Sequence, residues 1–263
     1  MMRKSVLKQV YLFFSSLFIF IIHIPFVFAK HKPVVEFKPK LTRIEATAHH
    51  GSSLILVKSV IENKVGSVYD SLRLNLMGLS RQAFEYAMKG FDYLVKAGKL
   101  GNEKILSIVD FSQPSGRKRL FVIDLDKYKV VFNTYVAHGM NSGLEYARQF
   151  SNSPASNKSS LGFYETMTTY NGKNGYSLQL QGLESGINDN ANVRAIVMHG
   201  APYVSESTVQ AKGFIGRSWG CPAIPENMKK PIIDKIKNGT CLFIYSPDNN
   251  YLNRSRILHP NGA

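Results

Sequence analysis

Two residues, His199 and Cys221, have the types and spacing of a thiol nucleophile and its base. His199 ends an apolar run, residues 195–198, which predicts a buried strand, and Cys221 follows 22 positions later in a glycine-rich turn. Cysteine attacks as the thiolate, so a nucleophilic cysteine needs a neighbouring group that takes its proton, and a strand-end imidazole can do this. From the spacing alone, a structural thiol and an imidazole bonded to backbone are an equal alternative.

The residues beside Cys221 would shape such a site. Pro222 has no amide hydrogen, so an oxyanion hole would draw on the amides of Gly220 and Cys221. Ser218 is expected to hold the turn through its hydroxyl group or to position His199. The sequence therefore places the main chemistry in one short turn and one strand end.

Three further side chains are candidates for substrate binding, each with a simpler alternative. Arg217 is the cation nearest to Cys221 in the sequence and suits a substrate carboxylate, with a solvated arginine as the alternative. Trp219, the only tryptophan, is expected to wall a cleft or to pack beneath it. His138 ends a predicted strand as His199 does, and is expected to line the cleft or to bond to the backbone.

Several separated motifs in one order resemble a known family. The pair His199-Gly200 is followed by Ser218-Trp219-Gly220-Cys221, the histidine-glycine and serine-X-glycine-cysteine signature of the L,D-transpeptidase catalytic domain family of bacterial cell-wall enzymes. The other motifs that agree are Val136-Ala137-His138-Gly139, Phe150-Ser151-Asn152, Ser159-Ser160-Leu161-Gly162-Phe163-Tyr164, Gly182-Leu183-Glu184 and Gly216-Arg217-Ser218. The resemblance covers about residues 105–245, and several motifs are more specific than one.

The resemblance implies a fold and marks two departures. It implies a mainly β fold with α-helices (α+β), namely a β-sandwich catalytic domain of the L,D-transpeptidase type, here with an N-terminal helical extension. The X of the signature is often His or Asn and is Trp219 here, which bears on access to the nucleophile. The arginine commonly found two positions after the cysteine is Ala223, so Arg217 is the candidate that replaces it in binding a carboxylate.

The resemblance also implies a reaction on peptidoglycan stem peptides. Cys221 would attack the bond between the third stem residue, an L-centre, and D-alanine, with His199 taking and returning the proton. The family's matching serine, Ser218 here, is part of the site. A thioester acyl-enzyme would then pass to an amine, which is cross-linking or remodelling of the cell wall. With water as the acceptor, the same site would be an L,D-carboxypeptidase, and the sequence does not separate the two outcomes.

Two rival functions come from other classes. A zinc peptidase using His138, His199 and an acid is disfavoured because the sequence has no HExxH-like pair, and no metal or cofactor is expected. A catalytically silent wall-binding module on the same fold is the other rival. A reactive Cys221 thiol would exclude the silent module, and turnover that withstands a chelator would exclude zinc.

The amino terminus predicts export. Arg3, Lys4 and Lys8 precede an apolar stretch, residues 11–28, and a small-residue cleavage site ends at Ala29. Residues 1–29 are therefore interpreted as a signal peptide, and the protein is expected in the periplasm or cell envelope. The alternative is an uncleaved membrane anchor, since the apolar stretch approaches the length that spans a bilayer.

The charge of the chain favours anionic partners. The full sequence has a net charge of +15, with 33 Lys and Arg against 18 Asp and Glu, and loss of residues 1–29 removes three cations and no acids. The mature chain would carry a net charge of +12. No nucleic-acid recognition motif occurs, so the acidic cell envelope is the expected partner, and nucleic acid is not.

Two cysteines leave a disulfide as the main rival to the nucleophile. In an oxidising compartment, Cys221 and Cys241 could pair. Cys241 lies in an apolar run, residues 240–245, that predicts a core strand, so a buried free thiol is favoured there. His49-His50 lacks a third ligand at metal-site spacing and is interpreted as a loop pair.

Periodicity predicts a helical region followed by a sheet. A helix is expected from Ser80 to Gly98, with a shorter helix through Val68, Leu72 and Leu76 beside it. The expected strands are residues 105–111, 119–125, 128–137, 161–168, 176–180, 195–199 and 240–245, with a turn at 126–127, another at 171–175, a helical turn at 186–192 and a helix at 228–237. The long polar segment 140–160 is expected to be a substrate-facing loop.

These elements predict four regions. Residues 1–29 form the signal peptide, 30–103 a tether and helical extension, 104–246 the catalytic domain, and 247–263 a polar tail whose order the sequence does not decide.

Overall fold

The computed structural model describes residues 65–260. The predicted export signal, most of the tether and the His49-His50 pair lie outside the described residues. Within 65–260, no helix is both long and apolar enough to cross a membrane.

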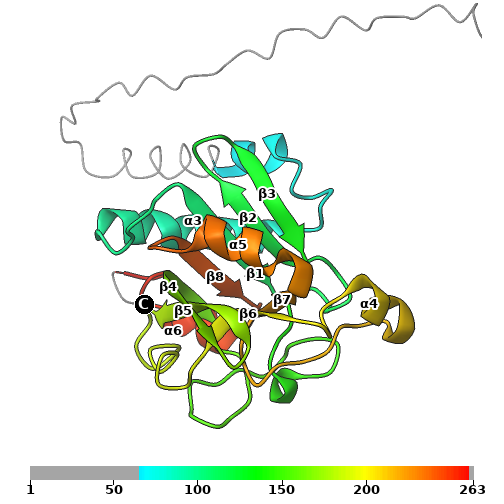
Figure 1. The fold of residues 1–263 in the computed structure, drawn as a ribbon. Helices are drawn as coiled ribbons and strands as arrows, with labels where there is room; N and C mark the ends of the chain where they lie inside the picture. Colours follow the sequence, from blue (N-terminus) through cyan, green and yellow to red (C-terminus); the bar gives the residue numbers. More distant parts are fainter. Residues whose placement is uncertain (1–64, 261–263) are drawn as a thin grey trace, which may run out of the picture. The chain divides into compact units, whose positions relative to one another are not determined.

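An eight-stranded mixed sheet forms the centre of the described chain (Figure 1). Its strands are β1 (Ile105–Asp110), β2 (Leu120–Asp124), β3 (Lys129–Thr134), β4 (Gly162–Gly172), β5 (Gly175–Gly182), β6 (Val197–Ala201), β7 (Ala223–Pro225) and β8 (Cys241–Tyr245). They are hydrogen-bonded in the order β3-β2-β1-β8-β4-β5-β6-β7 as one continuous sheet, and the β1–β8 and β6–β7 pairs are parallel. The predicted α+β class is confirmed.

Helices precede, interrupt and follow the strands along the described chain. They are α3 (Arg81–Lys96), α4 (Glu206–Lys212), α5 (Lys229–Ile236) and α6 (Asn249–Arg254), with short 3-10 helices η1 (Met140–Ser142) and η2 (Glu226–Met228). The helix predicted after Ser80 is confirmed as α3, and the Ser80 side chain caps it by accepting the Ala83 amide. Figure 1 shows α4 standing apart from the other helices.

Helix α3 packs into the same hydrophobic core as the sheet. Phe84 and Leu94 of α3 are buried together with Phe163 and Phe243, whose rings stack at 4.2 Å. A Cβ atom at Gly90 would lie 2.0 Å from the Phe163 ring, so only glycine permits this approach of helix and sheet. Helix α3 and the sheet therefore share one hydrophobic core. The predicted domain boundary at residue 103 stays a prediction.

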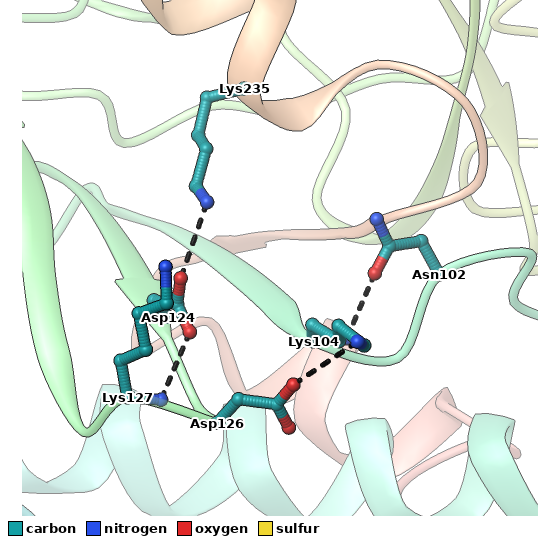
Figure 2. Close-up of polar contacts among 6 residues, drawn as sticks. All are labelled: Asn102, Lys104, Asp124, Asp126, Lys127 and Lys235. Carbon is teal, nitrogen blue, oxygen red and sulfur yellow. Dashed lines mark hydrogen bonds and ion pairs between the residues drawn. The ribbon is translucent and has the colours of Figure 1, made fainter.

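Charged contacts hold the turn between β2 and β3 (Figure 2). Asp124 accepts the Lys127 amide at 3.0 Å and lies 3.2 Å from Lys235 Nζ of α5, while Lys104 pairs with Asp126 at 3.4 Å. Burial alone would raise the pKa of Asp124, but the contacts with Lys127 and Lys235 outweigh it and lower this pKa. The predicted turn is confirmed, and it is tied to α5.

Some predicted elements end earlier than expected. The first described helical segment ends at residue 71, where the next turn includes Arg73 at a φ of 52°, and Leu76 is 76% exposed. The prediction of a helix through Leu76 was therefore wrong, because a left-handed residue interrupts it. Strand β3 also stops at Thr134, three residues before the predicted end.

The C-terminal segment packs on the domain as far as residue 260. Tyr251, Leu252, Ile257 and Leu258 are buried, and the Tyr251 hydroxyl group donates to Glu184 at 3.0 Å. The sequence left the order of this segment open, and apolar burial together with one buried carboxylate holds it in place.

Candidate active site

His199 lies in the interior of strand β6 with its side chain almost fully buried. Its Nδ1 is 2.8 Å from the Gly200 carbonyl oxygen, which can only accept, so Nδ1 carries the proton and Nε2 holds the lone pair. Burial lowers the pKa of His199, which favours the neutral ring at pH 7. The imidazole is thus in the tautomer of a general base.

Close packing explains why the residue after His199 is a glycine. A Cβ atom at Gly200 would lie 2.4 Å from a Glu226 oxygen and 2.6 Å from the Lys229 side chain. The start of the η2–α5 segment therefore covers β6 at the point where the imidazole is held, which fixes the ring's hydrogen-bond acceptor in place.

Cys221 lies in the turn that leads into β7, the parallel neighbour of β6. His199 pairs with Ala223, so Cys221 lies two residues before that partner. Residues 221 and 222 are not part of the strand, and Cys221 packs in the main hydrophobic core, whereas Ala223 belongs to a second, smaller cluster. The register of β6 and β7 therefore brings the Cys221 turn beside β6, although Cys221 is 22 residues from His199 in the chain.

Ser218 and Gly220 form the turn that presents Cys221. The Ser218 hydroxyl group donates to the Cys221 carbonyl oxygen at 2.6 Å and accepts the Gly220 amide at 3.1 Å. Gly220 has a φ of 122°, where glycine alone is unstrained, and its Cβ would meet the Lys158 carbonyl oxygen at 2.9 Å. Ser218 holds the turn, as one of its two predicted roles states. The Gly220 amide is engaged in that turn, so its expected place in an oxyanion hole was wrong for this structure.

The Cys221 thiol is set among backbone groups. Its Sγ donates to the Ala195 carbonyl oxygen at 3.7 Å, and Ala195 is a non-glycine residue at a φ of 51°. Burial raises the pKa of Cys221, while the amides of Val197 and Cys221 and the Arg194 guanidinium act to lower it. Cys221 as a residue is 9% exposed.

The loop of residues 140–160 lies against the Cys221 turn. The Ser159 hydroxyl group donates to the Gly220 carbonyl oxygen at 3.3 Å and accepts the Gly139 amide at 3.0 Å. Gly139 also pairs with Ser218 in an isolated parallel bridge. The loop that the sequence predicted to face substrate is thus packed beside the turn of Cys221.

A small second hydrophobic cluster supports the segment between the two catalytic candidates. It consists of Tyr135, Ala137, Ala201, Val204, Ile215 and Ala223, with Tyr203 and Val209 packed against it. Helix α4 has no buried residue, and Tyr135 reaches it by donating to Glu206 at 2.7 Å. The chain therefore leaves β6 and returns to β7 over this cluster.

His138 is buried and does not line the site. Its Nδ1 accepts from Arg119 Nη2 at 2.7 Å, and its Nε2 donates to the Gly143 carbonyl oxygen at 3.1 Å. Both residues have no exposed surface, and burial, with the nearby Arg119 cation, lowers the pKa of His138 to about 4. The proposed substrate contact was wrong, because both ring nitrogens bind protein. The alternative of an imidazole bonded to backbone is confirmed.

Arg217 and Trp219, close to Cys221 in the sequence, are both exposed. Arg217 Nη1 donates to the carbonyl oxygens of Met140 and Gly143, at 3.1 and 3.3 Å, and so holds the start of the loop. Trp219 is 72% exposed, so the expectation that it packs beneath the cleft was wrong. Its substrate contact stays a prediction.

Arg194 is the residue at the site that sequence reasoning missed. Its guanidinium donates to the carbonyl oxygens of Ser151 and Lys158, at 2.7 and 2.6 Å, and to the hydroxyl groups of Ser156 and Ser160. It is also the cation that acts on the Cys221 thiol. No sequence pattern marks it, because it lies 27 positions before the cysteine.

Cys241 is a core residue, as predicted. It is fully buried in β8, and burial raises the pKa of its thiol far above the ordinary value. Both cysteines are free, so the structure contains no bond between Cys221 and Cys241. Among residues 65–260, no three His, Cys, Asp or Glu side chains gather as a metal site.

Comparison with known proteins identifies the family. The model of the L,D-transpeptidase catalytic domain matches residues 76–245, which is more than half of the chain. The chain belongs to the L,D-transpeptidase catalytic domain family. A comparison with curated proteins gave no match.

Several solved structures are similar at low identity. An L,D-transpeptidase from Mycobacterium smegmatis has 11% identity and a TM-score of 0.34, with 54% of this chain and 59% of that chain covered. The helical cell shape determining protein of Campylobacter jejuni has 15% identity and a TM-score of 0.36, with 62% and 57% covered. An L,D-transpeptidase from Stackebrandtia nassauensis has 15% identity and a TM-score of 0.33, with 61% and 66% covered. This chain thus spans less than two thirds of each, and the identification rests on the family match.

Proposed function

We propose that this chain is an exported cysteine acyl-transferase that acts on peptidoglycan stem peptides. Membership of the family supports peptidoglycan cross-linking or remodelling. One observation carries the assignment of the residues. The base-competent imidazole of His199 lies in β6, and Cys221 lies two residues before Ala223, the register partner of His199 on the parallel strand β7.

The reaction begins with proton transfer from Cys221 Sγ to His199 Nε2. The thiolate attacks the carbonyl carbon between the third stem residue and D-alanine, and the carbonyl oxygen becomes an oxyanion. The Cys221 amide is the donor nearest to it, since the Gly220 amide is engaged by Ser218. Catalytic hydrogen bonds of an unliganded enzyme are often longer than those formed with substrate, so we expect the His199 to Cys221 contact to tighten on binding.

Collapse of the tetrahedral intermediate breaks the C–N bond. The His199 imidazolium returns its proton to the leaving D-alanine amine, and Cys221 retains the acyl group as a thioester. An amine acceptor then gives its proton to His199 Nε2 and attacks the thioester, Cys221 leaves as the thiolate, and the His199 imidazolium returns that proton to Cys221. The net reaction exchanges one amide bond for another.

Two exposed side chains beside Cys221 are proposed as substrate contacts. Arg217 would bind a stem carboxylate with the guanidinium nitrogens that do not face the loop backbone, in place of the arginine replaced by Ala223. Trp219, at 72% exposure, would form one wall of the cleft. Ser218 holds the turn between them.

Amine transfer is proposed over hydrolysis. The loop of residues 140–160 packs against the Cys221 turn through Ser159, and it can contribute to an acceptor site and shield the thioester from water. Water as the acceptor would make the same enzyme an L,D-carboxypeptidase.

Export is proposed from residues 1–29, with the periplasm or cell envelope as the location. The net positive charge of the chain fits the acidic envelope. Amino-terminal sequencing of protein recovered from the envelope tests this. A chain that begins at Lys30 supports cleavage, and one that begins at Met1 in a membrane fraction means an uncleaved anchor.

The deciding experiment is incubation of the purified chain with disaccharide-tetrapeptide, with the products followed by mass. We expect a cross-linked dimer, and exchange of the terminal residue when a D-amino acid is added. Loss of D-alanine alone would instead mean carboxypeptidase activity.

Two variants make this assay specific. Cys221→Ser should yield no product, whereas Cys241→Ser, which changes a core cysteine far from any proposed contact, is the matched thiol control. If neither product nor a covalent adduct at Cys221 forms with the unmodified chain, the enzymatic function is refuted and a silent wall-binding module is the better explanation.

A further inference from the structure

We infer that Arg194 is the counter-ion of the Cys221 thiolate and a positioning residue for the turn that carries it. The inference rests on the proposed role of Cys221 as nucleophile. It assigns the electrostatic support of the sulfur to a cation that lies 27 residues before it in the chain rather than to Arg217, which is four residues away.

Arg194 reaches the Cys221 turn directly. Its Nη2 lies 3.4 Å from the position of a Cβ atom at Gly220, the residue before the nucleophile. The same nitrogen donates to the Lys158 carbonyl oxygen at 2.6 Å, and that oxygen is itself 2.9 Å from the Gly220 position. The residue after Arg194 is Ala195, whose carbonyl oxygen accepts from the Cys221 Sγ.

Both terminal nitrogens of the guanidinium have hydrogen-bond acceptors, but no anion balances its charge. Its four acceptors are two carbonyl oxygens and two hydroxyl oxygens, all of them neutral. No carboxylate of the described chain forms an ion pair with it, and Nε is buried without a partner. A partly buried cation of this kind gains most from a nearby anion, and ionisation of Cys221 supplies one.

Among residues 65–260, no other charged group takes this place. The titratable groups that interact with the thiol or the guanidinium are the phenols of Tyr203 and Tyr164. Burial, with the Cys221 charge, raises the pKa of Tyr203 to about 12, and burial raises the pKa of Tyr164 still further, so both phenols are neutral at pH 7. The buried His199 ring is neutral as well.

The four loop contacts add a positioning role. Arg194 joins Ser151, Ser156, Lys158 and Ser160 of the loop to the strand that leads into His199. The cation is therefore held by the loop in a fixed place beside the turn, and it keeps its own proton throughout the reaction. The proton of Cys221 goes to His199, while Arg194 stabilises the charge left on sulfur.

The test is the pH dependence of Cys221 alkylation by iodoacetamide, which reads thiolate formation without turnover. The full chain with Cys241→Ser is used, so that Cys221 is its only thiol. Arg194→Gln should move the alkylation midpoint up by about one pH unit and slow alkylation about tenfold at pH 7, with the rate at high pH unchanged. Arg148→Gln, which removes an exposed loop cation, is the charge-matched control and should leave the midpoint in place.

Arg194→Lys separates charge from anchoring. Lysine keeps the cation and loses the planar fork, so its midpoint should stay within about half a pH unit of the parent while its unfolding midpoint in urea falls. An unshifted Arg194→Gln profile overturns the inference. A full-unit shift in Arg194→Lys also overturns it, and this variant decides if Arg194→Gln does not fold. Alkylation needs no stem peptide. The alkylation profile therefore tests the role of Arg194 even if the transpeptidase assay gives no product.

Discussion

Acidification should destabilise the protein through one buried histidine. His138 has no exposed surface, and its Nδ1 accepts a hydrogen bond from the Arg119 guanidinium. Protonation of His138 would remove that acceptor and set two cations against each other without water. The neutral ring is therefore a condition of the native packing beneath the 140–160 loop.

The size and sign of the change in unfolding free energy follow from the pKa values of His138 in the folded and unfolded chains. The folded pKa of His138 is about 4, against an ordinary value of 6.5, so the unfolded chain binds the proton more tightly. The contribution is fully present above about pH 6.5 and is lost as the pH falls from there towards about 4. At about 1.4 kcal/mol per pH unit, the full loss is about 3 kcal/mol of unfolding free energy.

Urea unfolding between pH 4 and pH 8 measures this loss, with His138→Asn as the reference. Asparagine keeps an acceptor near the Nδ1 position and does not titrate, so the variant should be less stable at pH 8 but should lose about 3 kcal/mol less on acidification. His199, whose pKa burial also lowers, titrates in both proteins and cancels in the difference. Equal pH slopes in the two proteins would refute the reasoning.

Three further changes test the site. Cys221→Ser should reduce turnover below about one thousandth of the wild-type rate, because His199 cannot readily activate a hydroxyl group, while Cys241→Ser should keep its turnover; equal losses would place the effect in the fold. Gly220→Ala should cost about 2–3 kcal/mol in urea unfolding, because its φ is 122° and its Cβ would lie 2.9 Å from a backbone oxygen, and a change under about 0.5 kcal/mol would contradict the geometry. Trp219→Ala should raise KM for stem peptide with stability unchanged within about 0.5 kcal/mol, since the ring is 72% exposed; an unchanged KM would remove it from the cleft.

The central strands and the long helix could be predicted because their side chains face one core. Strand β1 is buried along its whole length and four of its six residues are apolar, and α3 has a capped, amphipathic sequence. Helix α4 buries no side chain and so leaves no apolar stripe to find, and β7 has only three residues. Short or fully exposed elements take their form from the neighbours they pair with.

The residues of the candidate site also differ in how far the sequence could predict their roles. His199 and Cys221 were singled out from local patterns, a histidine-glycine pair after an apolar run and a cysteine in a glycine-rich turn, although His199 lies in the interior of β6 and not at its end. His138 is also followed by glycine, and its contacts with Arg119, 19 residues earlier, and with Gly143 make it a buried structural residue. Arg194 likewise comes close to the Cys221 turn only in the folded chain, and no local sequence pattern predicts this contact.

The separate cluster beneath α4 makes the segment between the two catalytic candidates exchangeable. Val204 and Ile215 are buried on either side of residues 205–213, which contact the rest of the protein through Glu206 and through Val209, which packs against the cluster. A graft that replaces these nine residues and retains both anchors should leave β6, β7 and the Cys221 turn in register. The surface near Cys221 can thus be redesigned, or diversified by insertion, without rebuilding the strands that carry His199 and lead from Cys221.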